Sequence, residues 1–284
     1  MNKEKILELI EFQKTFFGIP IINSINSIGS IILFDVPVSI NINEDPNYVI
    51  IGNAAWRITK NDKFIVGSGD DREKIKCSLE DFIGLKITDF LYLDKYLNVQ
   101  ICLENGYAIE TFFHWRSESQ WELCMTSKNY GIDLNLLTTE EIDETCNSSP
   151  GFFVEQKFKE INIGADELII EDIFISDYSR LNIHFEDRMC CQLEEVAWRI
   201  DSKKDNVLLC QCFEEPLREE AVFNSMIGQK LHRIEVSENL MDARFFIGDD
   251  IVLHAFAGSA EKSLWVILKG DALIYEARNP LNND

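Results

Sequence analysis

The chain spells one short stretch twice, as NAAWRI at residues 53–58 and as EVAWRI at residues 195–200. A second similar stretch follows each copy further along the chain. It reads IGLKI, with Gly84, in the first copy and IGQKL, with Gly228, in the second. From these glycines onward the two copies align without a gap. The aligned positions agree in apolar character more than in identity, as expected for a duplicated fold. The sequence therefore predicts an internal repeat.

The repeat extends to a later tryptophan in each copy. Trp121 follows the first glycine by as many residues as Trp265 follows the second. The polar stretch DETCNSSPG, residues 143–151, ends in Pro and Gly and is typical of a linker. We therefore predict two homologous tandem modules, residues 1–148 with an N-terminal helix and residues 149–284.

Period-two alternation predicts antiparallel strands in both modules. In LNVQICLENGYAIETFF, residues 97–113, apolar and polar residues alternate on both sides of Asn105-Gly106. This dipeptide favours the positive φ angles of a tight hairpin turn. The second copy places Asp249-Asp250 at the same turn. With LKITDFLYL or KLHRIEV before the hairpin and a Trp-led strand after it, we predict a four-stranded meander in each module. WRI and the runs FIVG and VLLC are expected as further strands.

Helix signals are few. Residues 3–17 carry an apolar stripe, Ser78 resembles an N-cap for a helix ending at Gly84, and its counterpart would run from about Pro216 to Gly228. The predicted fold class is therefore α+β and mostly antiparallel β. Each module is expected to hold a β-meander sheet with one or two short helices.

The charge of the chain is strongly acidic. Among 284 residues, 49 Asp and Glu oppose 27 Lys and Arg, for a net charge of −22, and the acidic residues occur in both halves. Such a field repels nucleic acid and anionic membranes and attracts basic proteins, although it also serves solubility. We expect a basic protein partner, no nucleic acid and no membrane.

The N-terminus MNKEKILELIEF carries glutamates and resembles no signal peptide, and no apolar run is long enough to cross a membrane. We therefore expect a cytoplasmic protein whose 8 cysteines are reduced. Cys190, Cys191, Cys210 and Cys212, with His184 nearby in the sequence, come closest to a metal site. Their spacing is not the usual zinc spacing and the first module lacks them, so we expect neither metal nor cofactor, and metal binding by these cysteines stays an open question.

Catalytic signals are weak. None of the histidines (His114, His184, His232 and His254) recurs at an equivalent position of the other module, and His254 aligns with Glu110. No Ser or Cys stands in a nucleophile motif. The repeated Trp-Arg pair suits either a ligand site or a packed tryptophan beside an arginine bound to a carboxylate of its own module, and we favour the second. The residues expected to be structural are Trp56, Arg57, Gly84, Trp121, Trp198, Arg199, Gly228 and Trp265.

Paired acidic residues are the candidates for partner binding, because complementary charge raises the association rate and the selectivity of an interface. The alternative is a solvated surface, with some of these carboxylates at helix N-termini. The candidate residues are Asp70, Asp71, Glu140, Glu141, Asp143, Glu144, Glu214, Glu215, Glu219, Glu220, Asp249 and Asp250.

The repeated motifs resemble small acidic bacterial domains, some of which look like immunity proteins of polymorphic toxin systems. The motifs that carry the resemblance are Ala55-Trp56-Arg57-Ile58, Ile83-Gly84, Asn105-Gly106 and Trp121 in the first copy, and Ala197-Trp198-Arg199-Ile200, Ile227-Gly228 and Trp265 in the second. The resemblance implies binding and inhibition without catalysis.

We therefore expect a non-catalytic inhibitor of the immunity class that neutralises a basic toxin or nuclease by steric and electrostatic occlusion. One alternative is an oligomeric scaffold or a phage-type inhibitor of a bacterial defence complex, in which self-association, as a homo-oligomer, would matter more than charge. A second alternative is an enzyme with a pocket between the modules.

Overall fold

The computed structural model divides the chain into two compact units, Met1–Gln156 and Lys157–Asp284. The residues that the structure describes are 8, 10–26, 31–36, 47–52, 54–93, 98–113, 121–125, 128–131, 157–162, 168–176, 180–194, 196–202, 207–211, 216–237, 242–260 and 264–277. The predicted boundary after residue 148 lies outside these ranges.

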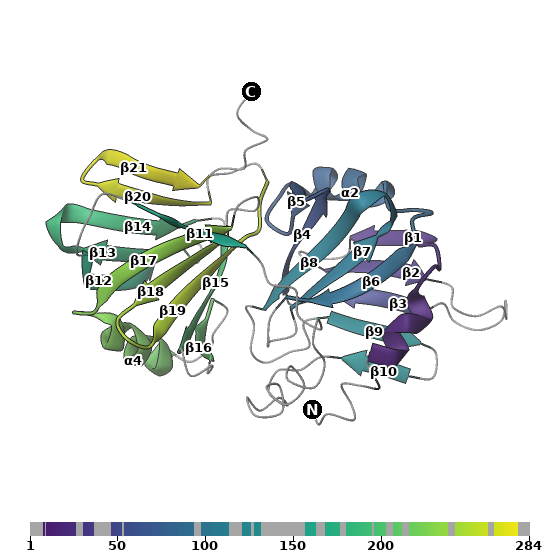
Figure 1. Ribbon diagram of the computed structural model, residues 1–284, viewed down its shortest axis with the longest axis horizontal. Coiled ribbons are helices and arrows are strands. Elements are labelled where there is room, and N and C mark those ends of the chain that lie inside the picture. The colour runs from purple at the N-terminus through teal and green to yellow at the C-terminus, as the bar shows by residue number, and fades with distance from the viewer. Residues whose placement is uncertain are drawn as a thin grey trace. The chain divides into compact units, whose positions relative to one another are not determined.

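The first unit contains two antiparallel sheets of five strands each (Figure 1). One sheet has the order β1-β2-β3-β9-β10, and its strands are β1 (Asn23–Asn26), β2 (Ile32–Val36), β3 (Asn47–Ile51), β9 (Trp121–Met125) and β10 (Lys128–Gly131). The other has the order β5-β4-β8-β7-β6, and its strands are β4 (Ala54–Lys60), β5 (Lys63–Gly67), β6 (Ile87–Tyr92), β7 (Val99–Leu103) and β8 (Tyr107–Phe113).

The second unit forms one 11-stranded sheet, with the order β16-β15-β19-β18-β17-β12-β13-β14-β20-β21 and with β11 (Phe158–Ile161) paired to β17. Its other strands are β12 (Leu168–Ser176), β13 (Arg180–Phe185), β14 (Met189–Leu193), β15 (Val196–Ser202), β16 (Val207–Cys210), β17 (Lys230–Ser237), β18 (Ala243–Ile247), β19 (Ile251–Ala257), β20 (Trp265–Lys269) and β21 (Ala272–Ala277).

The strand orders of the two units correspond. The run β16-β15-β19-β18-β17 repeats β5-β4-β8-β7-β6, and β12-β13-β14-β20-β21 repeats β1-β2-β3-β9-β10. Local irregularities correspond as well, because the register shift after Ile87 on β6 is matched by one after Leu231 on β17. The mostly antiparallel β class predicted from the sequence is confirmed.

The two units differ in how their halves are joined. In the second unit, β12 pairs with β17 through Leu168 and Ile169, and this pairing joins the two halves into one sheet. In the first unit the corresponding contact is an isolated bridge between Pro20 and Lys86. In the first unit, then, the described strands of the two halves are joined by isolated bridges and not by a ladder.

The hairpin predictions are confirmed, whereas the four-stranded meander is wrong. In the first unit β6, β7 and β8 are consecutive neighbours, but the next strand, β9, pairs with β3 and β10 in the other sheet. In the second unit β20 likewise pairs with β14 and β21. Alternation predicts strands but carries no information about which distant strand each one joins.

One predicted helix is misplaced and another is confirmed. Helix α2 (Arg72–Glu80) begins after Asp71, whose carboxylate accepts a hydrogen bond from the backbone N–H of Glu73. Ser78 therefore lies in its last turn and is not the N-cap. Helix α4 (Pro216–Met226) begins where proline predicts it. Within the predicted N-terminal helix, residues 8 and 10–13 are helical and lead into a 3₁₀ turn, Lys14–Phe16.

The core of the first unit draws on both of its sheets and on α2. Ile32 and Phe34 on β2, Trp56 on β4, and Ile75 and Leu79 on α2 belong to one buried cluster. Ile75 and Leu79 lie four residues apart and so share one face of the helix. Burial of these side chains between two sheets and a helix is the main stabilising contribution in this unit.

Candidate functional site

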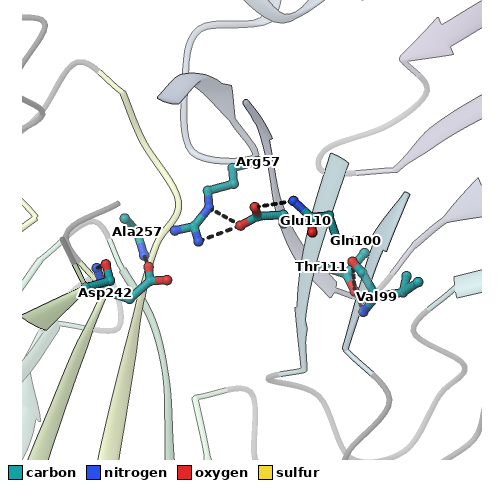
Figure 2. A network of polar contacts seen from close by, with 8 residues as sticks. Arg57, Val99, Gln100, Glu110, Thr111, Asp242 and Ala257 are labelled. Carbon is teal, nitrogen blue, oxygen red and sulfur yellow. Dashed lines mark hydrogen bonds and ion pairs between the residues drawn. The ribbon is translucent and has the colours of Figure 1, made fainter. Parts of the chain in front are cut away.

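The repeated arginine of the first unit is buried and bound to a glutamate. Arg57 is 0% exposed, and its Nε and Nη2 atoms lie 2.8 Å and 2.6 Å from Oε2 of Glu110. The second carboxylate oxygen of Glu110 accepts a hydrogen bond from the side-chain amide of Gln100 at 3.1 Å. Figure 2 shows the three side chains aligned in this order. Both oxygens of this buried carboxylate are therefore satisfied, as burial of a charge requires.

Strand register places these residues together. Arg57 on β4 lies directly opposite Glu110 on β8, and Glu110 lies opposite Gln100 on β7. Directly opposed residues of antiparallel strands point to the same face of a sheet. Trp56, the neighbour of Arg57, points to the other face and is completely buried in the core. In this repeated pair, the tryptophan thus packs into the core on one face of the sheet, and the arginine binds a carboxylate on the other face.

The repeated arginine of the second unit is bound to a different residue. Nε of Arg199 lies 3.0 Å from both carboxylate oxygens of Asp201, which stands two positions further along the same strand, β15. Nε2 of His254 lies 3.2 Å from Oδ2 of Asp201. Asp201 and Arg199 are buried, and the side chain of His254 is 23% exposed. One carboxylate therefore connects a guanidinium and an imidazole.

His254 lies between two arginines of neighbouring strands. It is directly opposite Arg199 on β15 and Arg244 on β18. The guanidinium carbon of Arg244 lies 3.8 Å from the centre of the Phe158 ring, and Arg244 is opposite Glu235 on β17. The corresponding row of the first unit reads Arg57, Glu110, Gln100, so the second unit has an imidazole in place of a carboxylate.

The surroundings shift two pKa values in this row. Burial acts to raise the pKa of Asp201, but the charge of Arg199 and the hydrogen bond from His254 outweigh it, so the pKa is lowered. Burial lowers the pKa of His254 most strongly. The hydrogen bond and charge of Asp201 oppose this effect, Arg199 and Arg244 add to it, and the net pKa lies below the ordinary histidine value. The structure thus favours an ionised Asp201 beside a neutral His254.

Two expected partner-binding residues of the first unit, Asp70 and Asp71, lie in the described part of the chain and differ in exposure. The side chain of Asp70 is 0% exposed, accepts a hydrogen bond from the N–H of Gly67 and lies 3.7 Å from Nζ of Lys74. Asp71 is exposed and caps helix α2. Asp70 is therefore occupied inside the unit, and Asp71 has a structural role at the surface.

In the second unit, Asp249, Asp250 and Glu220 are exposed, and Glu219 is half-buried. Asp249 and Asp250 occupy the turn between β18 and β19, as predicted. Burial raises the pKa of Glu219. The remaining expected partner-binding residues lie outside the described residues: Glu140, Glu141, Asp143, Glu144, Glu214 and Glu215.

The residues expected to be structural lie at buried or conformationally special positions. Trp198 and Trp265, like Trp56, are 0% exposed, whereas the side chain of Trp121 lies outside the described part. Gly84 and Gly228 have φ angles of +90° and +78°, in the left-handed region that favours glycine. Among the described residues, Nε1 of Trp198 is buried without a hydrogen-bond partner.

The cysteines and histidines do not assemble into a described metal centre. Cys190 is half-buried and Cys191 is buried, and burial raises the pKa of both thiols. His184 and His232 are exposed. No group of three or more His, Cys, Asp or Glu side chains in the described ranges could hold a metal ion. His114, Cys212 and the side chain of Cys210 lie outside those ranges.

Sequence reasoning missed Glu110, Asp201 and Arg244 as members of the two polar rows. The alignment of His254 with Glu110 was one available signal, because a charge-changing difference beside a repeated arginine calls for a compensating change. Asp201 follows Arg199 by two residues on a strand and so shares its face, which was a second signal.

Comparison of the chain with protein-family models, with curated proteins and with solved structures finds no match. In the part of the chain that the structure describes, no helix is both long and apolar enough to cross a membrane.

Proposed function

We propose that this protein is a binding inhibitor of the immunity class, which neutralises a basic toxin or nuclease by covering its active cleft. The observation that carries the proposal is the charge: a net −22, with acidic residues in both halves of the sequence. Such a field accelerates association with a basic protein and disfavours association with nucleic acid. Inhibition would then be steric, with charge providing speed and selectivity.

The exposed acidic turn of the second unit supports this proposal. Asp249 and Asp250 are adjacent, exposed and located at the tip of the β18–β19 hairpin. The carboxylates of Glu110 and Asp201, in contrast, are buried against Arg57 and Arg199. The acidic residues thus include an internal set that supports the fold and an external set that is accessible to a partner.

We further propose that the two units descend from one duplicated module. The support is the corresponding strand order of the units, together with the AWRI stretch on β4 and β15. The left-handed glycine before β6 or β17 is a further corresponding feature. A duplicated binding module offers two related surfaces, which the inhibitor can use on one partner or on two.

The test is capture of a basic protein by the purified chain at low and at high salt, followed by inhibition of that protein's activity. The variant Asp249→Lys/Asp250→Lys should reduce the association rate at low salt and have a smaller effect at high salt. A matched control, Glu171→Lys/Asp271→Lys, makes the same charge change at exposed residues outside the expected set.

Equal loss of binding in both variants would indicate a general effect of charge without a defined surface. Unchanged binding and inhibition in both, or recovery of the chain alone as a stable, salt-insensitive oligomer, would contradict the inhibitor proposal and favour a scaffold.

A further inference from the structure

The row Arg199, His254 and Arg244 crosses three neighbouring strands of the second unit. All three side chains point to one face of the sheet because they are directly opposed. One carboxylate, Asp201, lies within 3.2 Å of the imidazole and within 3.0 Å of Arg199. The row therefore already holds two positive charges around an imidazole whose neutral form the surroundings favour.

We propose that this row makes the folding of the second unit sensitive to mild acid, whereas the equivalent row of the first unit does not have this effect. A proton on His254 would place three cationic side chains beside the single carboxylate of Asp201. Like charges held at neighbouring positions of adjacent strands destabilise a sheet. The first unit has Glu110 at the equivalent position, with the neutral Gln100 opposite, so it has no imidazole to protonate there.

Among the described residues, the charged groups that face His254 are Arg199 and Asp201 from β15 and Arg244 from β18. Of these three, Asp201 opposes the effect of the arginines, by its charge and by its hydrogen bond. Arg244 has a second acidic neighbour, Glu235, which lies opposite it on β17 and so on the side away from His254. The net effect of these charges and of burial favours the neutral form of the His254 imidazole.

The direction of the pH effect follows from linkage. The unfolded chain takes up a proton near the ordinary histidine value of about 6.5, whereas the folded unit resists it because the pKa of His254 is lowered. The stabilisation is fully present above about pH 6.5 and is lost as the pH falls toward the folded pKa. Because the pKa of Asp201 is also lowered, a second loss follows at more acidic pH.

The experiment is urea unfolding of the full chain between pH 8 and pH 5, with hydrogen exchange, corrected for intrinsic rates, to assign each transition to a unit. The unfolding equilibrium constant of the second unit should rise by up to about tenfold for each pH unit below about 6.5. His254→Gln keeps an N–H donor for Asp201 and cannot be protonated, so it should remove this slope. His232→Gln, at an exposed histidine on β17, is the matched control and should keep the slope.

An NMR titration of the wild-type imidazoles decides the matter even if His254→Gln does not fold. His254 should titrate below the ordinary histidine pKa of about 6.5. The proposal is overturned if His254 titrates at or above that value, or if His254→Gln keeps the wild-type pH slope. It is also overturned if acid weakens β4 and β8 of the first unit before β15 and β19 of the second.

Discussion

The two buried arginines show how one structural requirement is met in two ways. Arg57 and Arg199 occupy corresponding places, next to a buried tryptophan on the second strand of the runs β5-β4-β8-β7-β6 and β16-β15-β19-β18-β17. In the first unit the neutralising carboxylate comes from the neighbouring strand, from Glu110, whereas in the second it comes from the same strand, from Asp201. The position of the cation is kept and the position of the anion is not.

The difference follows from the geometry of an antiparallel sheet. A side chain on one face has near neighbours two residues along its own strand and directly across on the adjacent strand. Residues 59 and 201 lie two positions along the strand from Arg57 and Arg199. Residues 110 and 254 lie directly across from these arginines. The first unit combines Thr59 with Glu110, and the second combines Asp201 with His254. Exchange of a carboxylate between two such places leaves the arginine neutralised.

The largest effect is expected when the pair in the first unit is broken on one side. Glu110→Ala removes the carboxylate that binds two nitrogens of the buried Arg57. Removal of one partner of a buried ion pair costs about 3–5 kcal/mol, because a buried charge remains. Urea denaturation, with the transition of the first unit assigned by hydrogen exchange, measures this loss.

The control for this change is an exposed ion pair of the same unit. Glu11 binds Lys14 at the surface, where its side chain is 72% exposed. Glu11→Ala should alter the unfolding free energy by less than about 0.5 kcal/mol. Equal effects of Glu110→Ala and Glu11→Ala would show that Arg57 does not depend on its carboxylate.

An intermediate effect is expected when the arrangement of the second unit is built into the first. Glu110→His alone leaves Arg57 without a carboxylate partner on β8 and should be as harmful as truncation. Addition of Thr59→Asp supplies a carboxylate on the same strand, as Asp201 does for Arg199. The double variant should recover about 2 kcal/mol, a coupling within the range of residues in contact.

A double-mutant cycle over Thr59→Asp and Glu110→His measures this coupling directly. Thr59→Asp alone is the informative control, because it places a second buried carboxylate beside Glu110 and should destabilise the unit. Simple additivity of the two substitutions would mean that the two places are not interchangeable. The two units would then share their backbone arrangement but not an equivalent pair of carboxylate positions.

The sequence predicted the backbone features that depend on local pattern. The Asn105-Gly106 turn has φ angles of +60° and +75°, as a tight hairpin requires, and the start of α4 at Pro216 follows from a proline at the first helical position. Helix α2 was misplaced because Ser78 and Asp71 both resemble N-caps. The burial of Ile75 and Leu79 on one helix face favours the cap at Asp71.

Features that depend on distant pairing were not predictable in this way. The sequence alignment placed His254 on Glu110, but only the register of β15 with β19 brings His254 within reach of Asp201. The assignment of β9 and β20 to the other sheet is likewise a long-range property. A strand's own alternation is the same in either sheet, so its partner is decided by the packing of the whole unit.

The smallest effect is expected at the junction of the two sheets of the first unit. Pro20→Ile introduces the residue found at the equivalent position of the second unit, Ile169, which pairs with Lys230 on β17. The N–H of residue 20 points away from Lys86, because in this antiparallel bridge the N–H of the next residue, Ile21, bonds to the carbonyl of Leu85. The substitution should therefore add no bond to the ladder, and the loss of proline, which frees the unfolded chain, should lower the unfolding free energy by about 0.4–1 kcal/mol.

Urea denaturation and hydrogen exchange together check Pro20→Ile. The amide of Ile21, whose N–H bonds to the carbonyl of Leu85, should keep its protection while the unfolding free energy falls slightly. Slower exchange at Ile21 together with a higher unfolding free energy would show instead that the missing N–H of Pro20 keeps the two sheets apart.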